Sequence, residues 1–159
     1  HKIIEFFDFS KTDDIDGKID RRYEWQYITE DEKNSLSKKA LKDFFESEIF
    51  NRIKNADRVE REMRFLTEIP AFALDNTLEG DLAKEMVTLQ GAVDICFIEN
   101  SELIILDFKT DRVEDINELA VSYSEQLNAY AKACEKIFGL KVKEKIIYSF
   151  ALSSALIIK

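Results

Sequence analysis

The sequence predicts an α/β domain in which helices flank a mixed β-sheet. Two segments carry apolar residues at helical spacing, and four others have the alternating or continuous apolar patterns of strands. Their order along the chain, helix, three strands, helix, strand, describes an α/β sandwich. The chain has 159 residues, 45% of them hydrophobic, with only 4 Gly and 1 Pro, so we expect one ordered domain with a core.

The first helix is predicted to end near Ile53, after a polar region (residues 1–34) of weak periodicity. Ser35 and Ser37 are both suitable N-caps for this helix. Its apolar residues recur at helical spacing, at Leu41, Phe44, Phe45, Ile49 and Ile53. The segment is therefore an amphipathic helix that covers a sheet.

A first strand is predicted over residues 61–74. It is expected to be irregular or at an edge of the sheet, because Pro70 cannot donate a ladder hydrogen bond. The following residues, 76–84, are acidic and polar, and their Gly80-Asp81 step favours a turn.

Two further strands are predicted over residues 86–98 and 102–109. The run from Leu103 to Leu106 is apolar at every position, so it has no polar face. Such a run is typical of a central strand that is covered on both sides.

The second helix is predicted to begin at Ser122, which has capping-box spacing to Glu125, and to end at Gly139. A last strand follows over residues 142–150. The lysines around it alternate outward, at Lys141, Lys143 and Lys145. This stripe is either a solvated edge or a surface for DNA.

The two middle strands are predicted to form a hairpin that brings two carboxylates together. Asn100 and Ser101 lie midway between Asp94 and Asp107, so a two-residue turn there sets the aspartates directly opposite each other. Lys109 then lies on the same face as Asp107. Facing like charges destabilise a sheet, and a divalent cation would offset that cost. A three-residue loop would instead leave two unrelated aspartates on opposite faces.

These residues suit the hydrolysis of a phosphodiester bond. Asp94 and Asp107 would supply oxygen ligands to a hard divalent cation, and the backbone carbonyl of Phe108 could add a third. Lys109 would orient the attacking water or stabilise the charge of the transition state.

The composition limits the other possibilities. The net charge of −9 and the pI near 4.8 count against a stand-alone DNA-binding domain but do not exclude a nuclease. Cys96 and Cys134 belong to no Cys or His cluster, so this chain builds no zinc site or iron–sulfur cluster, and both are expected to be buried. The chain has no apolar stretch of membrane-spanning length and no secretory signal, so we expect a cytoplasmic location.

Three segments resemble successive motifs of a known family: residues 91–94 (Gly-Ala-Val-Asp), 107–113 (Asp-Phe-Lys-Thr-Asp-Arg-Val) and 126–130 (Gln-Leu-Asn-Ala-Tyr). They are similar to the RecB-type nuclease branch of the PD-(D/E)xK superfamily, and most closely to its AddA-type nuclease domains. The resemblance covers most of the chain and is specific from about residue 85 to 150. It implies a restriction-endonuclease-like fold, with a mixed central sheet flanked by helices.

The resemblance also implies roles for individual residues. Asp94 and Asp107 are implied as ligands of magnesium or manganese, and Lys109 as the catalytic lysine. Gln126 and Tyr130 share a helix face, because they lie four residues apart, and this face could contact the phosphate or DNA. Tyr130 could instead be a core aromatic residue.

Two further residues are implied with less support. Glu62 is offered as another acidic residue of the site, although it could be an ordinary charge at the end of a strand. His1 would complete the ligand set through nitrogen, which manganese accepts more readily than magnesium.

By the same resemblance, residues 1–159 form a single nuclease domain, a C-terminal fragment of a larger helicase–nuclease. Its substrate would be single-stranded DNA from an unwound duplex end, during double-strand-break repair and recombination. A second subunit of the AddB type would be the partner, and ATP would bind only in the helicase region. The alternative is a catalytically inactive interaction module that keeps the nuclease fold.

Overall fold

The computed structural model describes residues 37–158, so His1 lies outside the described residues. The described elements are α4 (Lys38–Phe45), α5 (Glu48–Asn55), β1 (Arg58–Pro70), the 3-10 helix η1 (Ala71–Ala73), α6 (Gly80–Lys84), β2 (Met86–Glu99), β3 (Glu102–Lys109), α7 (Ile116–Phe138), β4 (Val142–Ser149) and β5 (Ser154–Ile158). No helix in this part of the chain is long and apolar enough to cross a membrane.

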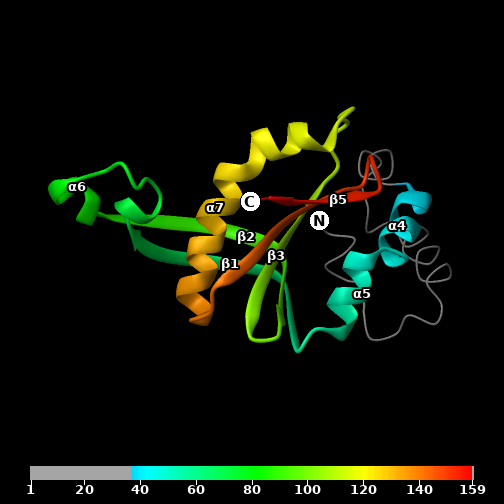
Figure 1. Cartoon of the computed structure of the whole chain (residues 1–159), viewed down its shortest axis with the longest axis horizontal. Helices are drawn as coiled ribbons and strands as arrows, with labels where there is room; N and C mark the ends of the chain where they lie inside the picture. Colours follow the sequence, from blue (N-terminus) through cyan, green and yellow to red (C-terminus); the bar gives the residue numbers. More distant parts are fainter. Residues whose placement is uncertain (1–36, 159) are drawn as a thin grey trace.

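The strands form one mixed sheet in the order β1-β2-β3-β4-β5. Neighbouring strands are antiparallel except for β3 and β4, which are parallel and are connected through α7. Figure 1 shows α7 on one side of the sheet and α4 and α5 beside its other end. The predicted α/β fold with a mixed sheet and flanking helices is confirmed.

Strand β3 is the centre of the core, as its apolar sequence predicted. Residues 103–108 are all buried. One hydrophobic cluster joins α4 and α5 to the sheet, and a second joins α7 to it. Phe44 anchors the first cluster, with its ring centroid 5.0–5.9 Å from five neighbouring rings, those of Phe45, Phe50, Phe108, Tyr148 and Phe150.

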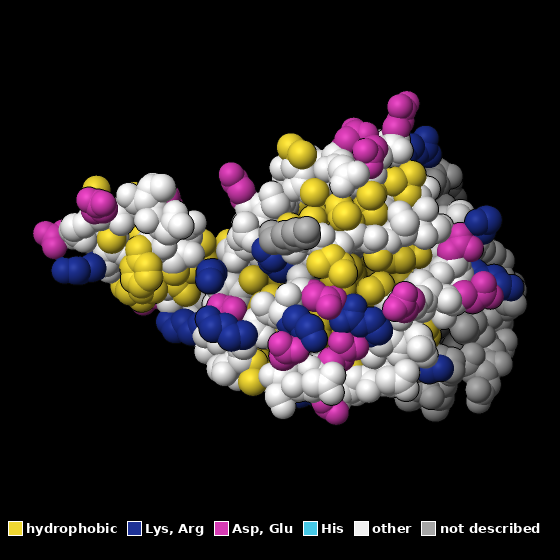
Figure 2. All heavy atoms as spheres, in the orientation of Figure 1, with side chains coloured by type: hydrophobic (Ala, Val, Ile, Leu, Met, Phe, Trp, Pro, Cys, Tyr) yellow, Lys and Arg dark blue, Asp and Glu magenta, His cyan; other side chains and the backbone are white. Residues whose placement is uncertain are grey.

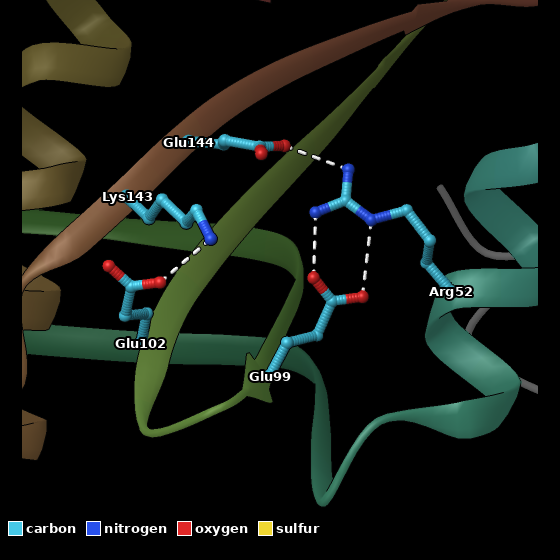
Figure 3. A network of polar contacts seen from close by, with 5 residues as sticks. All are labelled: Arg52, Glu99, Glu102, Lys143 and Glu144. Atoms are coloured by element: carbon cyan, nitrogen blue, oxygen red, sulfur yellow. Dashed lines mark hydrogen bonds and ion pairs between the residues drawn. The ribbon is translucent and has the colours of Figure 1, made fainter.

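A charged network fixes α5 against the sheet (Figure 3). Arg52 donates two hydrogen bonds to the Glu99 carboxylate, at 3.1 and 2.7 Å, and one to Glu144 at 2.8 Å. Glu99 comes from the end of β2 and Glu144 from β4. One guanidinium therefore links a helix to two strands that are not neighbours in the sheet.

The first predicted helix is in fact two helices. Ser37 caps α4 as expected, since its hydroxyl accepts a hydrogen bond from Ala40 N at 3.0 Å. Helix α4 then ends, and Ser47 caps the start of α5, because its hydroxyl accepts a hydrogen bond from Phe50 N at 3.2 Å. A second cap inside an amphipathic segment interrupted a helix that apolar spacing alone made continuous.

The predicted start of the second helix at Ser122 was wrong by six residues. Helix α7 begins at Ile116, and its capping box is formed by Asp115 and Glu118. Ser122 lies inside the helix, where its hydroxyl donates to Glu118 O at 3.1 Å. Serine can bond to the preceding turn in this way, so capping-box spacing alone did not locate the N-terminus. Gly139 ends the helix with a φ of 66°, as predicted.

Strand β1 is an edge strand, as predicted, but it ends at Pro70, four residues before the predicted end at residue 74, and the 3-10 helix η1 follows it. The predicted order of elements missed β5. Strand β5 pairs with β4 from Lys145 onward, so it covers the β4 edge at only the last of the three lysines of the stripe. Each lysine of the stripe has a partner within the chain: Glu135 for Lys141 at 3.4 Å, Glu102 for Lys143 at 2.7 Å, and Asn128 for Lys145 at 2.6 Å.

Beyond the body of the sheet, β1 and β2 continue as a two-stranded ribbon that carries η1 and α6. We call residues 63–93 the arm, because β2 pairs with β3 only from Ile95 onward. The turn predicted over residues 76–84 contains the short helix α6. Figure 1 shows the arm extending away from α4 and α5, and Figure 2 shows hydrophobic side chains on its outer lobe. Its exposed apolar residues are Leu66, Phe72, Leu74, Leu82 and Met86.

Candidate nuclease centre

The hairpin between β2 and β3 has the predicted two-residue turn. Glu99 pairs with Glu102, and the two residues between them, Asn100 and Ser101, have φ values of 52° and 64°. Two consecutive left-handed residues are the mark of a type I′ turn, which suits the twist of a hairpin.

This register places Asp94 opposite Asp107, one step beyond the last paired residues, Ile95 and Leu106. Strand β2 separates from β3 at this point, and a side chain replaces the backbone as hydrogen-bond partner. The Phe108 N–H donates to Asp94 Oδ2 at 2.7 Å. Because the N–H and C=O of one residue point to the same side of a strand, the Phe108 carbonyl also faces this gap.

Asp107 is buried, with 6% of its surface exposed. Lys109 Nζ lies 2.5 Å from Asp107 Oδ2, so the two side chains form an ion pair. Burial raises the pKa of Asp107, and the nearby charge of Asp94 raises it further, while Lys109 acts in the opposite direction. The fold therefore holds a carboxylate whose negative charge is only partly compensated by the protein.

A hard divalent cation fits these residues. Asp94 and Asp107 offer carboxylate oxygens, and Phe108 offers a carbonyl oxygen that faces the same gap. Within residues 37–158, no group of three or more His, Cys, Asp and Glu side chains is close enough to hold a metal ion.

Glu62 lies on β1 at the position opposite Asp94, between the two flanking pairs Arg61–Ile95 and Met63–Val93. Its φ of 47° is in the left-handed region, which a residue other than glycine seldom adopts, and the ladder is interrupted there. Glu62, Asp94 and Asp107 thus occupy matching positions on three neighbouring strands, although their carboxylates do not form a three-ligand group.

Helix α7 passes over the same end of the sheet. Gln126 Nε2 donates to the Tyr130 hydroxyl at 2.9 Å, as their spacing of four residues allows. Tyr130 packs edge-on against Phe65, with ring centroids 5.2 Å apart, and it also lies against Gly91. A Cβ at position 91 would be 2.8 Å from both rings, so only glycine permits this approach. Tyr130 is therefore half core residue, while its hydroxyl extends to the exposed Gln126.

Sequence reasoning missed Tyr123, the residue of α7 that contacts the lysine. Lys109 Nζ lies 3.8 Å from the centre of the Tyr123 ring, and the Tyr123 hydroxyl donates to Asp111 at 3.1 Å. The available signal was its position three residues before Gln126, which places both on one helix face. The cysteine prediction is confirmed, since Cys96 and Cys134 are free and buried.

Two facing carboxylates and an adjacent lysine thus lie where β2 separates from β3 in a mixed α/β fold. The chain belongs to the PD-(D/E)XK nuclease superfamily, whose family model matches residues 1–157. It is 37% identical over 155 residues to the ATP-dependent helicase/nuclease AddA protein of Clostridium kluyveri, covering 95% of this chain and 13% of the relative. It is 34% identical over 158 residues to the protein of the same name from Clostridium botulinum, covering 97% of this chain and 12% of the relative.

Proposed function

We propose that this chain is a divalent-metal-dependent deoxyribonuclease domain that hydrolyses phosphodiester bonds in single-stranded DNA. The observation that carries the proposal is the buried carboxylate of Asp107, which lies opposite Asp94 and forms an ion pair with Lys109. A protein that used these residues only for stability would gain by replacing such a buried charge. Retaining it fits a site that binds a cation.

In this proposal Asp94, Asp107 and the Phe108 carbonyl hold magnesium or manganese. The bound cation supplies a Lewis acid for the phosphoryl oxygens and lowers the pKa of its water. Lys109 donates its N–H groups toward the developing negative charge or orients the attacking water. Its ammonium is already placed beside the carboxylate, so little reorganisation is needed when substrate arrives.

Gln126 and Tyr130 are proposed to contact the DNA backbone. Gln126 is exposed, and its amide is oriented by the Tyr130 hydroxyl. Glu62 and His1 are proposed as additional ligands. The position of Glu62 opposite Asp94 supports its role, while His1 rests on the family resemblance alone.

We further propose that residues 1–159 act as the single nuclease domain at the C-terminal end of a cytoplasmic helicase–nuclease. The chain spans about an eighth of the length of the curated relatives it matches, whose names include both activities. The helicase region would bind ATP and deliver the single strand. A second, AddB-type subunit would complete the machine that processes double-strand breaks in DNA repair and recombination.

The test is cleavage of an end-labelled single-stranded oligonucleotide by the purified chain, with and without Mg²⁺ or Mn²⁺. We expect metal-dependent products, and a loss of at least about 100-fold in Asp107→Ala and Lys109→Ala. Leu82→Ser is the matched control, because Leu82 is 61% exposed on α6 of the arm. Equal cleavage by all four proteins, or none by the unmodified chain under any metal condition, would contradict the proposal.

Calorimetric titration with Mn²⁺ tests the two additional ligands. Each of Glu62→Gln and His1→Ala should weaken binding about 10-fold or more if the changed side chain coordinates the ion, and should leave the affinity unchanged if it does not. A folded chain that binds no Mn²⁺ at millimolar concentration would favour the inactive interaction module instead.

A further inference from the structure

We propose that Tyr123 is a positioning residue that holds the Lys109 ammonium in its working place. This inference rests on the proposed function, because it assigns Lys109 to catalysis. It adds a residue that lies outside the three motifs of the sequence and acts through its contact with the lysine.

The contact has the geometry of a cation–π interaction. Lys109 Nζ is 3.8 Å from the Tyr123 ring centroid, well within the range of about 6 Å at which the face of an aromatic ring attracts a cation. The Lys109 side chain is only 14% exposed, so water screens this attraction weakly. The ammonium therefore lies between two attractive groups, the Asp107 carboxylate and the Tyr123 ring.

The ring is itself held in place. The Tyr123 hydroxyl donates to Asp111 Oδ1 at 3.1 Å, and Asp111 follows Lys109 by two residues in the connection to α7. The other end of the connection is fixed by the capping box of Asp115 and Glu118. Burial and the hydrogen bond to Asp111 raise the pKa of Tyr123, so the phenol remains neutral. These contacts orient the ring toward the lysine.

A neutral ring can hold the Lys109 ammonium without adding a further negative charge to the site. Asp107 attracts Lys109 strongly, yet the same carboxylate is the proposed ligand for a cation. An additional acid beside the lysine would compete for that cation and would add another buried charge. The ring attracts the ammonium without either effect, and thus keeps the lysine extended when Asp107 is engaged elsewhere.

The kinetic test compares Tyr123→Phe with Tyr123→Leu in metal-dependent cleavage of single-stranded DNA. The phenylalanine keeps the aromatic face, so kcat should remain within about threefold of the unmodified chain. The leucine removes the face and should lower kcat by about 10- to 100-fold, with KM changed by less than about threefold. Phe138→Leu is the matched control, because its ring lies under Arg58 at the other end of α7, 5.5 Å from that guanidinium.

A second readout needs neither metal nor activity. Acetic anhydride labelling of the metal-free chain, read by peptide mass spectrometry, reports how well each lysine amine is protected. Lys109 should react more slowly than Lys132, whose side chain is 46% exposed, and Tyr123→Leu should raise the Lys109 rate by at least about threefold. Phe138→Leu should leave that rate unchanged, and Tyr123→Phe, which keeps the ring but loses the bond to Asp111, should raise it by less than Tyr123→Leu does.

The two readouts separate the inference from the function. If the unmodified chain cleaves no DNA but the leucine variant exposes Lys109, the nuclease proposal fails and the structural link between Tyr123 and Lys109 remains. If Tyr123→Leu changes neither the labelling of Lys109 nor kcat, or if Tyr123→Phe loses as much activity as Tyr123→Leu, the positioning role is overturned.

Discussion

The centre of the sheet and the arm differ in how far their apolar side chains are buried and in how many strands each strand pairs with. In β3, residues 103–108 are all buried between two hydrophobic clusters, and both edges of the strand are paired. In the arm, two strands pair only with each other, and five large apolar side chains are exposed. A two-stranded ribbon is only marginally stable by itself, so the arm depends for its stability on the sheet from which it extends.

The candidate nuclease centre lies at the boundary between these regions. Asp94 and Glu62 occupy the positions where the paired ribbon leaves the sheet, and Asp107 lies near the end of the covered strand β3. The covered strand provides the buried carboxylate of Asp107, while the separation of β2 from β3 leaves the Phe108 N–H for the Asp94 side chain to bind. The candidate centre therefore needs both regions: the covered strand holds the buried carboxylate, and the separation of the strands leaves backbone groups accessible.

The largest expected contrast is in the free energy of unfolding. Ile105→Ala removes a fully buried side chain from the central strand and should cost about 2–5 kcal/mol. Leu66→Ala changes an arm residue that is 72% exposed and should shift stability by no more than about 0.5 kcal/mol. Urea denaturation measures both values. A cost above about 2 kcal/mol for Leu66→Ala would show that the arm is packed in solution.

A smaller contrast is expected between two arginines. Arg52→Ala breaks the network with Glu99 and Glu144 and should destabilise the chain by about 1–3 kcal/mol. Arg58 instead forms an ion pair with Glu60 in which both side chains are well exposed, so Arg58→Ala should cost about 0.5 kcal/mol or less. Thermal unfolding of the two variants at low and moderate salt tests this, and equal losses would contradict it.

At the boundary, a substitution should stabilise the metal-free chain. Burial and Asp94 raise the pKa of Asp107, so the folded state binds this proton more tightly than the unfolded state does. The stability that protonation provides is present at acidic pH and is lost as pH rises through the folded pKa. Asp107→Asn should therefore raise stability at pH 7 by about 1 kcal/mol in EDTA and should remove this pH dependence.

The metal dependence of the same variant provides the control. Mn²⁺ should stabilise the unmodified chain by mass action and should have little effect on Asp107→Asn. Calorimetric scans in EDTA and in Mn²⁺ measure both effects. A variant that is less stable than the unmodified chain in EDTA would mean that Lys109 compensates the Asp107 charge fully.

The smallest expected effect on stability concerns a buried hydroxyl in the core, that of Tyr148. The Tyr148 hydroxyl is buried and has no hydrogen-bond partner among residues 37–158, and burial, aided by Asp43, raises the pKa of Tyr148 to about 12. The unfolded chain ionises this group near its ordinary pKa of about 10, so its contribution to stability falls between pH 10 and 12. Tyr148→Phe should gain about 1 kcal/mol at neutral pH and should lose less stability than the unmodified chain over that alkaline range. Urea denaturation at a series of pH values measures both effects, and a less stable variant at neutral pH would contradict the first.

The best sequence predictions were those that depend on local chemistry. The apolar run from Leu103 to Leu106 located the central strand, and Asn100-Ser101 gave the turn and hence the register of the aspartates. Gly139 gave the end of α7. In each case neighbouring residues in the sequence determine the structure, so a pattern along the chain is sufficient.

The errors came from competing local signals and from contacts across the fold. Ser122 and Asp115 both have capping-box spacing, and only the packed structure selects Asp115. Strand β5 exists because β4 offers it an edge. Tyr123 shares a helix face with Gln126, but its place beside Lys109 depends on the path of α7 over the sheet.

At Gly91 the arm packs very closely against α7, the helix that passes over the candidate nuclease centre. A methyl group there would collide with the rings of Phe65 and Tyr130, and Tyr130 holds the amide of Gln126. The lack of a side chain at position 91 therefore sets how closely α7 can approach the sheet. An engineer who wished to detune the proposed DNA contact without touching a polar group would begin with Gly91→Ala.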